Sequence, residues 1–82
     1  MKQLSLDILQ ILASNSDTYI SRSDIESKLE RVSKRAILNE LKLLQTLKRV
    51  KVAGQSSSTA YKISNAYYED FEKLLYIYQN QI

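Results

Sequence analysis

Hydrophobic residues recur three and four positions apart in three stretches of the first half of the chain, which is the spacing of amphipathic helices. One stretch predicts a helix over about residues 3–13, with an apolar face formed by Leu4, Ile8, Ile11 and Leu12. Ile25 and Leu29 predict a second, shorter helix that ends near Glu30. A third and longer helix is predicted over about residues 34–48, where nothing breaks a helix and most residue types favour it.

Serine residues precede the second and third predicted helices and can cap them. Ser21 is followed three residues later by Asp24, and Ser23 by Glu26, so the second helix can begin after either serine. Ser33 can accept a hydrogen bond from an early N–H group of the third helix.

After the third helix, the hydrophobic period changes from helical spacing to alternation. Val50-Lys51-Val52 and Tyr61-Lys62-Ile63 alternate apolar and charged residues on either side of a serine-rich loop. The pattern predicts a β-hairpin over residues 50–64, with its apolar face on the helices and its lysines toward water. Residues 19–20 predict one more short strand.

The last part of the chain, from about Ala66, returns to helical spacing and is more apolar than one core contact requires. A helix that is apolar on two sides needs two partners. One partner is the chain's own core, and we expect the other to be the same helix of a second copy, in a two-fold dimer. The alternative is a monomer in which one broad surface covers the whole helix. The predicted interface comprises Tyr67, Phe71, Leu74, Leu75, Tyr78 and Ile82.

The composition excludes several kinds of chemistry. The 82 residues include no cysteine and no histidine, which excludes disulfides, Cys/His zinc sites, thiol catalysis and imidazole acid–base chemistry. There is no glycine-rich phosphate loop, and the adjacent acids Glu69, Asp70 and Glu72 would point in different directions on a helix. We therefore expect a single small domain that works by binding and is not an enzyme, with no cofactor or metal. Because no apolar run approaches ~18 residues, we also expect a cytoplasmic location.

Positive charge is concentrated in the middle of the chain. The net charge is +3, but residues 28–62 carry nine basic and two acidic residues, while both flanking segments are mildly acidic. A basic centre between acidic ends predicts an anionic partner that docks at one place.

The third helix separates its side chains into an apolar and a basic face when its residues are placed 100° apart. The face predicted to enter the core contains Ile37, Leu41, Leu44 and Leu47, flanked by Leu38 and Leu43. Glu40 lies on the flank of this apolar stripe. The opposite face has no acidic member and carries Arg35, Asn39, Lys42, Thr46 and, if the helix continues that far, Arg49. In the major groove, Arg can pair with guanine and Asn with adenine, so this face predicts binding to duplex DNA. The alternative is a solvated face, which usually mixes both signs of charge.

The order of helix, short strand, helix, turn, helix, hairpin and helix resembles the winged helix-turn-helix family of DNA-binding proteins. The resemblance covers Tyr19 to Ser64. Its most specific places are Val32, an aliphatic residue in the turn, and Ser33, the cap of the recognition helix. It implies a mainly α fold with a small β-hairpin (α+β), built from a three-helix core, a wing and a C-terminal helix.

The resemblance also implies a DNA-binding domain, over residues 1–64, and the apolar pattern of residues 65–82 makes them the expected dimerisation helix. The expected function is sequence-specific binding of double-stranded DNA by a homodimer that regulates transcription, most simply as a repressor, with no small-molecule effector evident. The expected DNA-binding residues are Arg22, Ser23, Ser33, Lys34, Arg35, Asn39, Lys42, Thr46, Arg49, Lys51 and Lys62.

Two features depart from the family pattern. Glu30 and Arg31 stand where the turn often has a glycine, and the loop tip over residues 54–59 has no Arg or Lys to enter the minor groove. Two alternatives remain: a winged-helix adaptor that binds other proteins, and a DNA-binding protein of plasmid or viral replication or partition.

Overall fold

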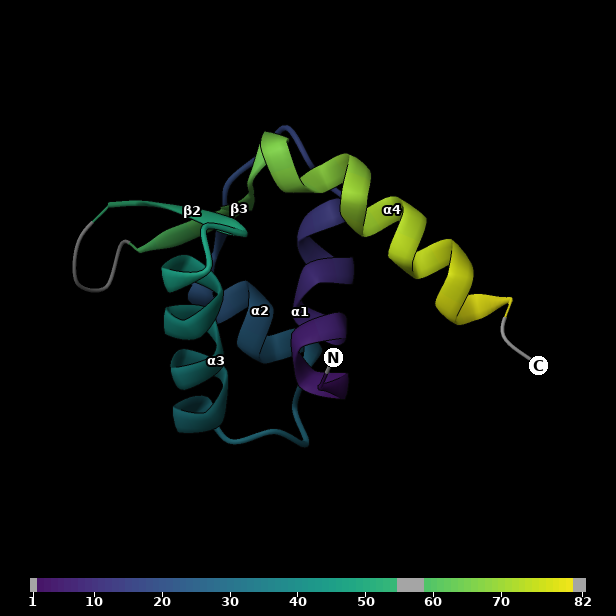
Figure 1. Ribbon diagram of the computed structural model, residues 1–82. Coiled ribbons are helices and arrows are strands. Elements are labelled where there is room, and N and C mark those ends of the chain that lie inside the picture. Colours follow the sequence, from purple (N-terminus) through teal and green to yellow (C-terminus); the bar gives the residue numbers. More distant parts are fainter. Residues whose placement is uncertain (1, 55–58, 81–82) are drawn as a thin grey trace.

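A computed structural model describes residues 2–54 and 59–80, apart from the side chain of Tyr78. Within these residues the chain forms four helices and a three-stranded antiparallel sheet, an α+β fold (Figure 1). Residues 55–58 of the predicted hairpin tip, and Ile82, lie outside the described residues. The elements are α1 (Gln3–Ala13), β1 (Ile20–Ser21), α2 (Arg22–Lys28), α3 (Lys34–Thr46), β2 (Val50–Ala53), β3 (Ala60–Ile63) and α4 (Asn65–Gln79). The predicted helices, the hairpin strands and the short first strand are therefore confirmed.

Serine hydroxyls cap the N-termini of α2 and α3, as the sequence predicts. Ser21 accepts a hydrogen bond from the N–H of Asp24 (3.1 Å), and Ser33 accepts one from the N–H of Ala36 (3.1 Å). Of the two serines that could begin α2, Ser21 is therefore the cap and Ser23 lies inside the helix.

The chain turns sharply at the C-terminus of α3, where Lys48 adopts the left-handed backbone conformation (φ 60°). The N–H of Lys48 donates to the carbonyl of Gln45 (3.0 Å), and the N–H of Arg49 donates to that of Leu44 (2.9 Å). These two bonds form a Schellman motif, which ends a helix. α3 thus ends at Thr46, before the predicted position 48, and Arg49 does not extend the polar face of the helix.

β3 is the central strand, and its neighbours on both sides determine which residues face the core. Ile20 of β1 pairs with Tyr61, and Val50 of β2 pairs with Ile63. All four residues are buried. Because side chains alternate along a strand, the two lysines of the hairpin lie on the other face of the sheet.

The core lies between the sheet and the helices, and only some of the leucines of α3 contribute to it. Ile37, Leu41 and Leu44 are fully buried. Leu43 and Leu47 are 46% and 49% exposed, so the prediction that they belong to the core face is wrong. Leu47 follows the last residue of α3, and Leu43 is rotated by about 100° from its buried neighbour Leu44.

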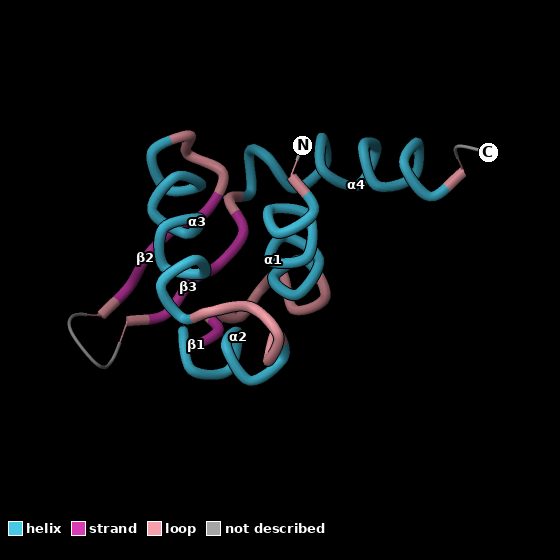
Figure 2. The backbone as a smooth tube through the Cα atoms, turned by 90° about the horizontal axis from the view of Figure 1, so that it is seen from below, coloured by secondary structure: helices cyan, strands magenta, loops and turns pink. Residues whose placement is uncertain are grey.

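α4 begins against the body of the molecule and then extends away from it, as two perpendicular views show (Figures 1 and 2). Phe71 is fully buried, with its ring 6.1 Å from that of Tyr67. The prediction that Phe71 contacts a second copy is therefore wrong, because the chain's own core already covers it. Farther along the helix, Leu74, Tyr76 and Ile77 are exposed by 45%, 69% and 62%.

Candidate nucleic-acid interface

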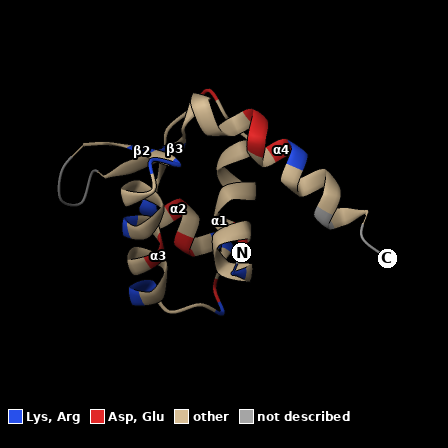
Figure 3. Cartoon of the chain, in the orientation of Figure 1, with Lys and Arg blue, Asp and Glu red and all other residues tan. Residues whose placement is uncertain are grey.

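The exposed face of α3 carries the four polar residues predicted for this helix. Arg35, Asn39, Lys42 and Thr46 are all exposed, and they extend over about 16 Å of the helix axis. Figure 3 shows basic positions along the side of α3 that faces away from α1. Within the described part of the chain, the side chains of Arg35, Asn39 and Lys42 form no hydrogen bond or ion pair.

Glu40, the acidic residue of α3, points away from this face. It is 4% exposed, and its Oε2 accepts a hydrogen bond from Ser5 Oγ of α1 (2.8 Å). Lys2 Nζ lies 3.8 Å from its other carboxylate oxygen. Because α1 takes up the carboxylate, only positive charge remains on the exposed face, which favours an anionic ligand.

The Thr46 hydroxyl is already engaged within the helix. Its Oγ1 donates to the carbonyl oxygen of Lys42 (3.0 Å). The methyl group and the acceptor side of the oxygen remain available to a ligand. Thr46 therefore offers apolar contact and a hydrogen-bond acceptor at the C-terminal end of the basic face.

A groove between α2 and the start of α3 brings together three of the predicted DNA-binding residues. Ser23, Ser33 and Lys34 line it, and its volume is about 520 Å³. Glu26 and Glu30 line the same groove. Because two carboxylates face one lysine there, this groove suits a phosphate less well than the exposed face of α3 does.

Arg22, the first residue of α2, forms an ion pair with a carboxylate of the same helix. Its Nε lies 3.6 Å from the carboxylate of Glu26, one turn away. Burial raises the pKa of Tyr61, and the nearby Arg22 guanidinium opposes that rise. Because the Glu26 carboxylate partly neutralises it, Arg22 attracts an anionic ligand less strongly than a lysine without a carboxylate partner does.

Lys51 and Lys62, the predicted backbone contacts of the hairpin, lie directly opposite each other across β2 and β3. Lys51 is exposed, whereas Lys62 is partly buried with its Nζ 5.8 Å from the centroid of the Tyr19 ring. Sequence reasoning found both lysines but missed their pairing and the contribution of Tyr19. The alternation of residue types does not reveal register, although an aromatic residue within the predicted short strand was a signal.

Arg49 lies apart from the face formed by α3. It is partly buried at the junction with β2, and its guanidinium carbon is 4.9 Å from the centroid of the Tyr67 ring in α4. Its carbonyl oxygen accepts a hydrogen bond from the N–H of Ser64 (2.9 Å). This cation–π contact ties α4 to the end of α3 and leaves less of the guanidinium for a phosphate.

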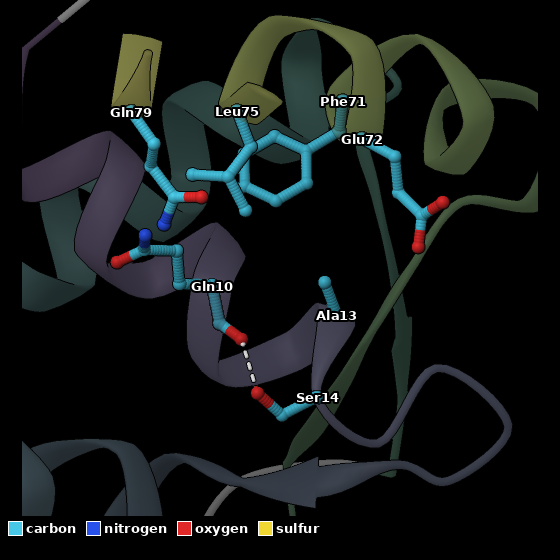
Figure 4. A pocket seen from close by; sticks show the side chains of 7 residues that line it. All are labelled: Gln10, Ala13, Ser14, Phe71, Glu72, Leu75 and Gln79. Atoms are coloured by element: carbon cyan, nitrogen blue, oxygen red, sulfur yellow. Dashed lines mark hydrogen bonds between the residues drawn. The ribbon is translucent and has the colours of Figure 1, made fainter. Parts of the chain in front are cut away.

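A second concave surface lies between α1 and α4 (Figure 4). Its volume is about 480 Å³, and Ser14 Oγ at its edge donates to the carbonyl of Gln10 (2.9 Å). Beside it, a hydrogen bond to Glu72 raises the pKa of Tyr68. Lined by amide, apolar and acidic side chains, this groove does not complement a phosphate. Its lining residues are Gln10, Ala13, Ser14, Phe71, Glu72, Leu75 and Gln79.

Neither a metal centre nor a membrane span is found in the part of the chain that the structure describes. Its Asp and Glu side chains form no group of three or more that could hold a metal ion. None of its helices is both long and apolar enough to cross a bilayer. No protein-family model matches the chain, and no curated protein matches it either.

Proposed function

We propose that this chain is a winged helix-turn-helix protein that binds double-stranded DNA, with α3 in the major groove and the β2–β3 hairpin along the backbone. The observation that carries the proposal is the exposed face of α3. Arg35, Asn39 and Lys42 are open to solvent there, while the carboxylate of Glu40 is turned into α1.

The dimensions of α3 suit this role. The major groove of B-DNA is about 12 Å wide and admits an α-helix. Arg35 and Asn39 are one turn apart, about 6 Å along the axis, which corresponds to roughly two base-pair steps. Arg35 would make two hydrogen bonds to a guanine and Asn39 two to an adenine, while Lys42 would reach a phosphate.

The proposed assembly is a homodimer joined by α4. Leu74 and Ile77 support it, because they lie one turn apart and are exposed on the part of α4 that extends away from the body. A two-fold dimer would present two copies of α3 to half-sites about 34 Å apart, or a multiple of that distance. Such a protein would act in transcription most simply as a repressor that occupies its operator.

Selection of bound sequences from a random duplex pool tests the proposal. We expect enrichment of one sequence that contains G and A about two steps apart, repeated as inverted half-sites. Fluorescence anisotropy should then show tighter binding to the selected duplex than to a scrambled duplex at the same salt concentration. A pool that stays unenriched, together with equal affinity for both duplexes, would contradict the proposal.

A protein–protein adaptor is the second candidate function, because fold alone does not decide function. Exposed apolar residues favour it, namely Leu43 in α3, Leu47 just after that helix and Tyr76 in α4. An adaptor would give no gel shift with random duplex at moderate salt, where non-specific binding of a basic chain is weak. It would also tolerate Arg35→Ala without any change in its binding properties.

A further inference from the structure

The outer face of the sheet carries two lysines at one position of the β2–β3 ladder. Val50, Tyr61 and Ile63 are buried on the inner face, and Lys51 and Lys62 oppose each other on the outer one. Directly opposite residues of an antiparallel pair have Cβ atoms about 4.5–5.5 Å apart. The two flexible side chains can therefore bring both ammonium groups to the same point above the sheet.

This pairing disfavours the folded state unless an anion is present. Like charges directly opposite each other on a sheet repel. Among the described residues, neither Lys51 nor Lys62 forms an ion pair, whereas Lys2 and Arg22 each have a carboxylate partner. An anionic ligand would remove the repulsion between the two lysines and so would bind more strongly than it would to one lysine alone.

Tyr19 holds one of the two lysines in place. The Nζ atom of Lys62 is 5.8 Å from the ring centroid, and the tyrosine is 43% exposed. Because β3 lies between β1 and β2, Tyr19 flanks Lys62 on the side opposite Lys51, and this cation–π contact leaves the side of the ammonium group toward Lys51 open to an anion. Ala53 and Ala60 form the next pair along the same face, and their side chains are too short to shield the lysines.

We infer that Lys51 and Lys62 together clamp one phosphate group of the duplex backbone, and that Tyr19 is a positioning residue for Lys62. This inference rests on the proposed function and deepens it, since it assigns the backbone contact of the hairpin to the outer face of the sheet. Inorganic phosphate offers the same chemistry as the phosphodiester, so the experiments must separate the two sources.

A salt titration of duplex binding tests the clamp. Fluorescence anisotropy is measured for the wild type, Lys51→Gln, Lys62→Gln and the double variant. Lys73→Gln removes the same charge from α4 and serves as the matched control. The slope of log K against log salt falls by about 1 for each phosphate that the protein no longer neutralises. We expect little change in either single variant, because the remaining lysine still neutralises the shared phosphate, a fall of about 1 in the double variant, and no change in the control.

Two outcomes of the titration would overturn the clamp. Falls of about 1 in each single variant and about 2 in the double variant would mean that the lysines bind separate phosphates. Unchanged slopes in all three variants would mean that they bind none.

The positioning role of Tyr19 has its own test in the same titration. Tyr19→Phe keeps the aromatic ring and should retain the wild-type slope. In the Lys51→Gln background, Tyr19→Leu removes the ring and should lower the slope as Lys62→Gln does there, with no further decrease when the two are combined. Equal slopes for the Phe and Leu variants in that background would show that the ring does not position Lys62.

Thermal unfolding without DNA distinguishes inorganic phosphate from the backbone. At low ionic strength, Lys51→Gln should raise Tm by about 1–4 °C because it removes the repulsion. Millimolar inorganic phosphate, compared with chloride at equal ionic strength, should raise the wild-type Tm by no more than this, because it can remove only the same repulsion. A large phosphate-specific rise in the wild type but not in the double variant, with duplex slopes unchanged, would identify a free phosphate as the ligand and refute the backbone assignment.

These measurements also separate failure of the clamp from failure of the proposed function. If Arg35→Ala relaxes the preference at one base pair while the double lysine variant keeps the wild-type salt slope, the clamp is wrong and the proposed function stands. If the wild type binds no duplex at any salt concentration, the proposed function fails, and the clamp for the duplex backbone fails with it.

Discussion

The side chains of Arg35 and Asn39 form no hydrogen bond or ion pair with the described part of the chain. Their polar groups are therefore available to a ligand. Replacing either with alanine should weaken binding to the selected duplex by ~1–3 kcal/mol and relax the preference at one base pair. Anisotropy with the selected duplex and its single-base variants measures both effects. Gln45→Ala, an exposed change elsewhere on α3, is the control. Wild-type affinity in both alanine variants would show that α3 is not the reading element.

Tyr67 carries a buried hydroxyl that finds no hydrogen-bond partner within the described residues. A buried polar group without a partner costs about 1–3 kcal/mol. Tyr67→Phe removes the hydroxyl but keeps the ring that contacts Arg49 and Phe71. We therefore expect the free energy of unfolding, measured by urea titration, to rise by about 1 kcal/mol. A fall in that free energy would mean that the hydroxyl makes a stabilising interaction.

At the scale of the element, the end of α3 contains a residue whose type does not suit its backbone conformation. Lys48 has φ 60°, a conformation that is unfavourable for residues with a Cβ atom and free of that strain for glycine. Lys48→Gly should therefore raise the free energy of unfolding by roughly 0.5–1 kcal/mol. Gln45→Gly, inside the helix, should lower it by about 1 kcal/mol. Urea titrations that showed a decrease in stability in both variants would contradict this account of the turn.

α1 determines which side of α3 faces the solvent. Ile37, Leu41 and Leu44 face the core, while the carboxylate of Glu40 is held by Ser5 of α1. Both contacts orient α3 so that its basic side faces the solvent. The orientation of the exposed, basic face of α3 therefore depends on the packing of α1 against α3 and not on α3 alone.

On the scale of the whole molecule, the described chain is elongated, with extents of 40 × 28 × 21 Å. The hairpin projects on one side and α4 on the other (Figure 1). The first turns of α4 are anchored by Phe71, whereas Leu74 and Ile77 farther along remain exposed. In the proposed dimer, Leu74, which was already expected at the interface, is joined by Ile77, while Phe71 stays in the core.

The dimer can be tested without DNA. Leu74→Asp and Ile77→Asp should each convert the dimer to a monomer, because a buried carboxylate without a partner disfavours an apolar interface. Asn80→Asp adds the same charge at an exposed position near the end of α4 and should leave the mass unchanged. Size-exclusion chromatography with light scattering gives the mass of each variant. A monomeric wild type, or dimeric Leu74 and Ile77 variants, would rule out this interface.

Much of the fold could be predicted because helices, strands and caps depend on neighbouring residues. The caps by Ser21 and Ser33 and the exposed positions of Arg35 and Asn39 follow from local hydrogen bonding and helical period. The errors concern helix ends and helix faces. Helical periodicity assigned Leu47 to the core. Because the helix ends at Thr46, one residue earlier, Leu47 is exposed.

The order of the elements and the acid-free side of α3 can be predicted from the amino-acid sequence, since both depend on interactions within a few residues. The hydrogen bond from Ser5 to Glu40, the burial of Phe71 in its own chain and the pairing of Lys51 with Lys62 arise from tertiary packing and strand pairing. Each of these contacts joins residues of different elements. Such contacts depend on strand register and on the packing of helices against one another, which the local pattern of residue types does not specify.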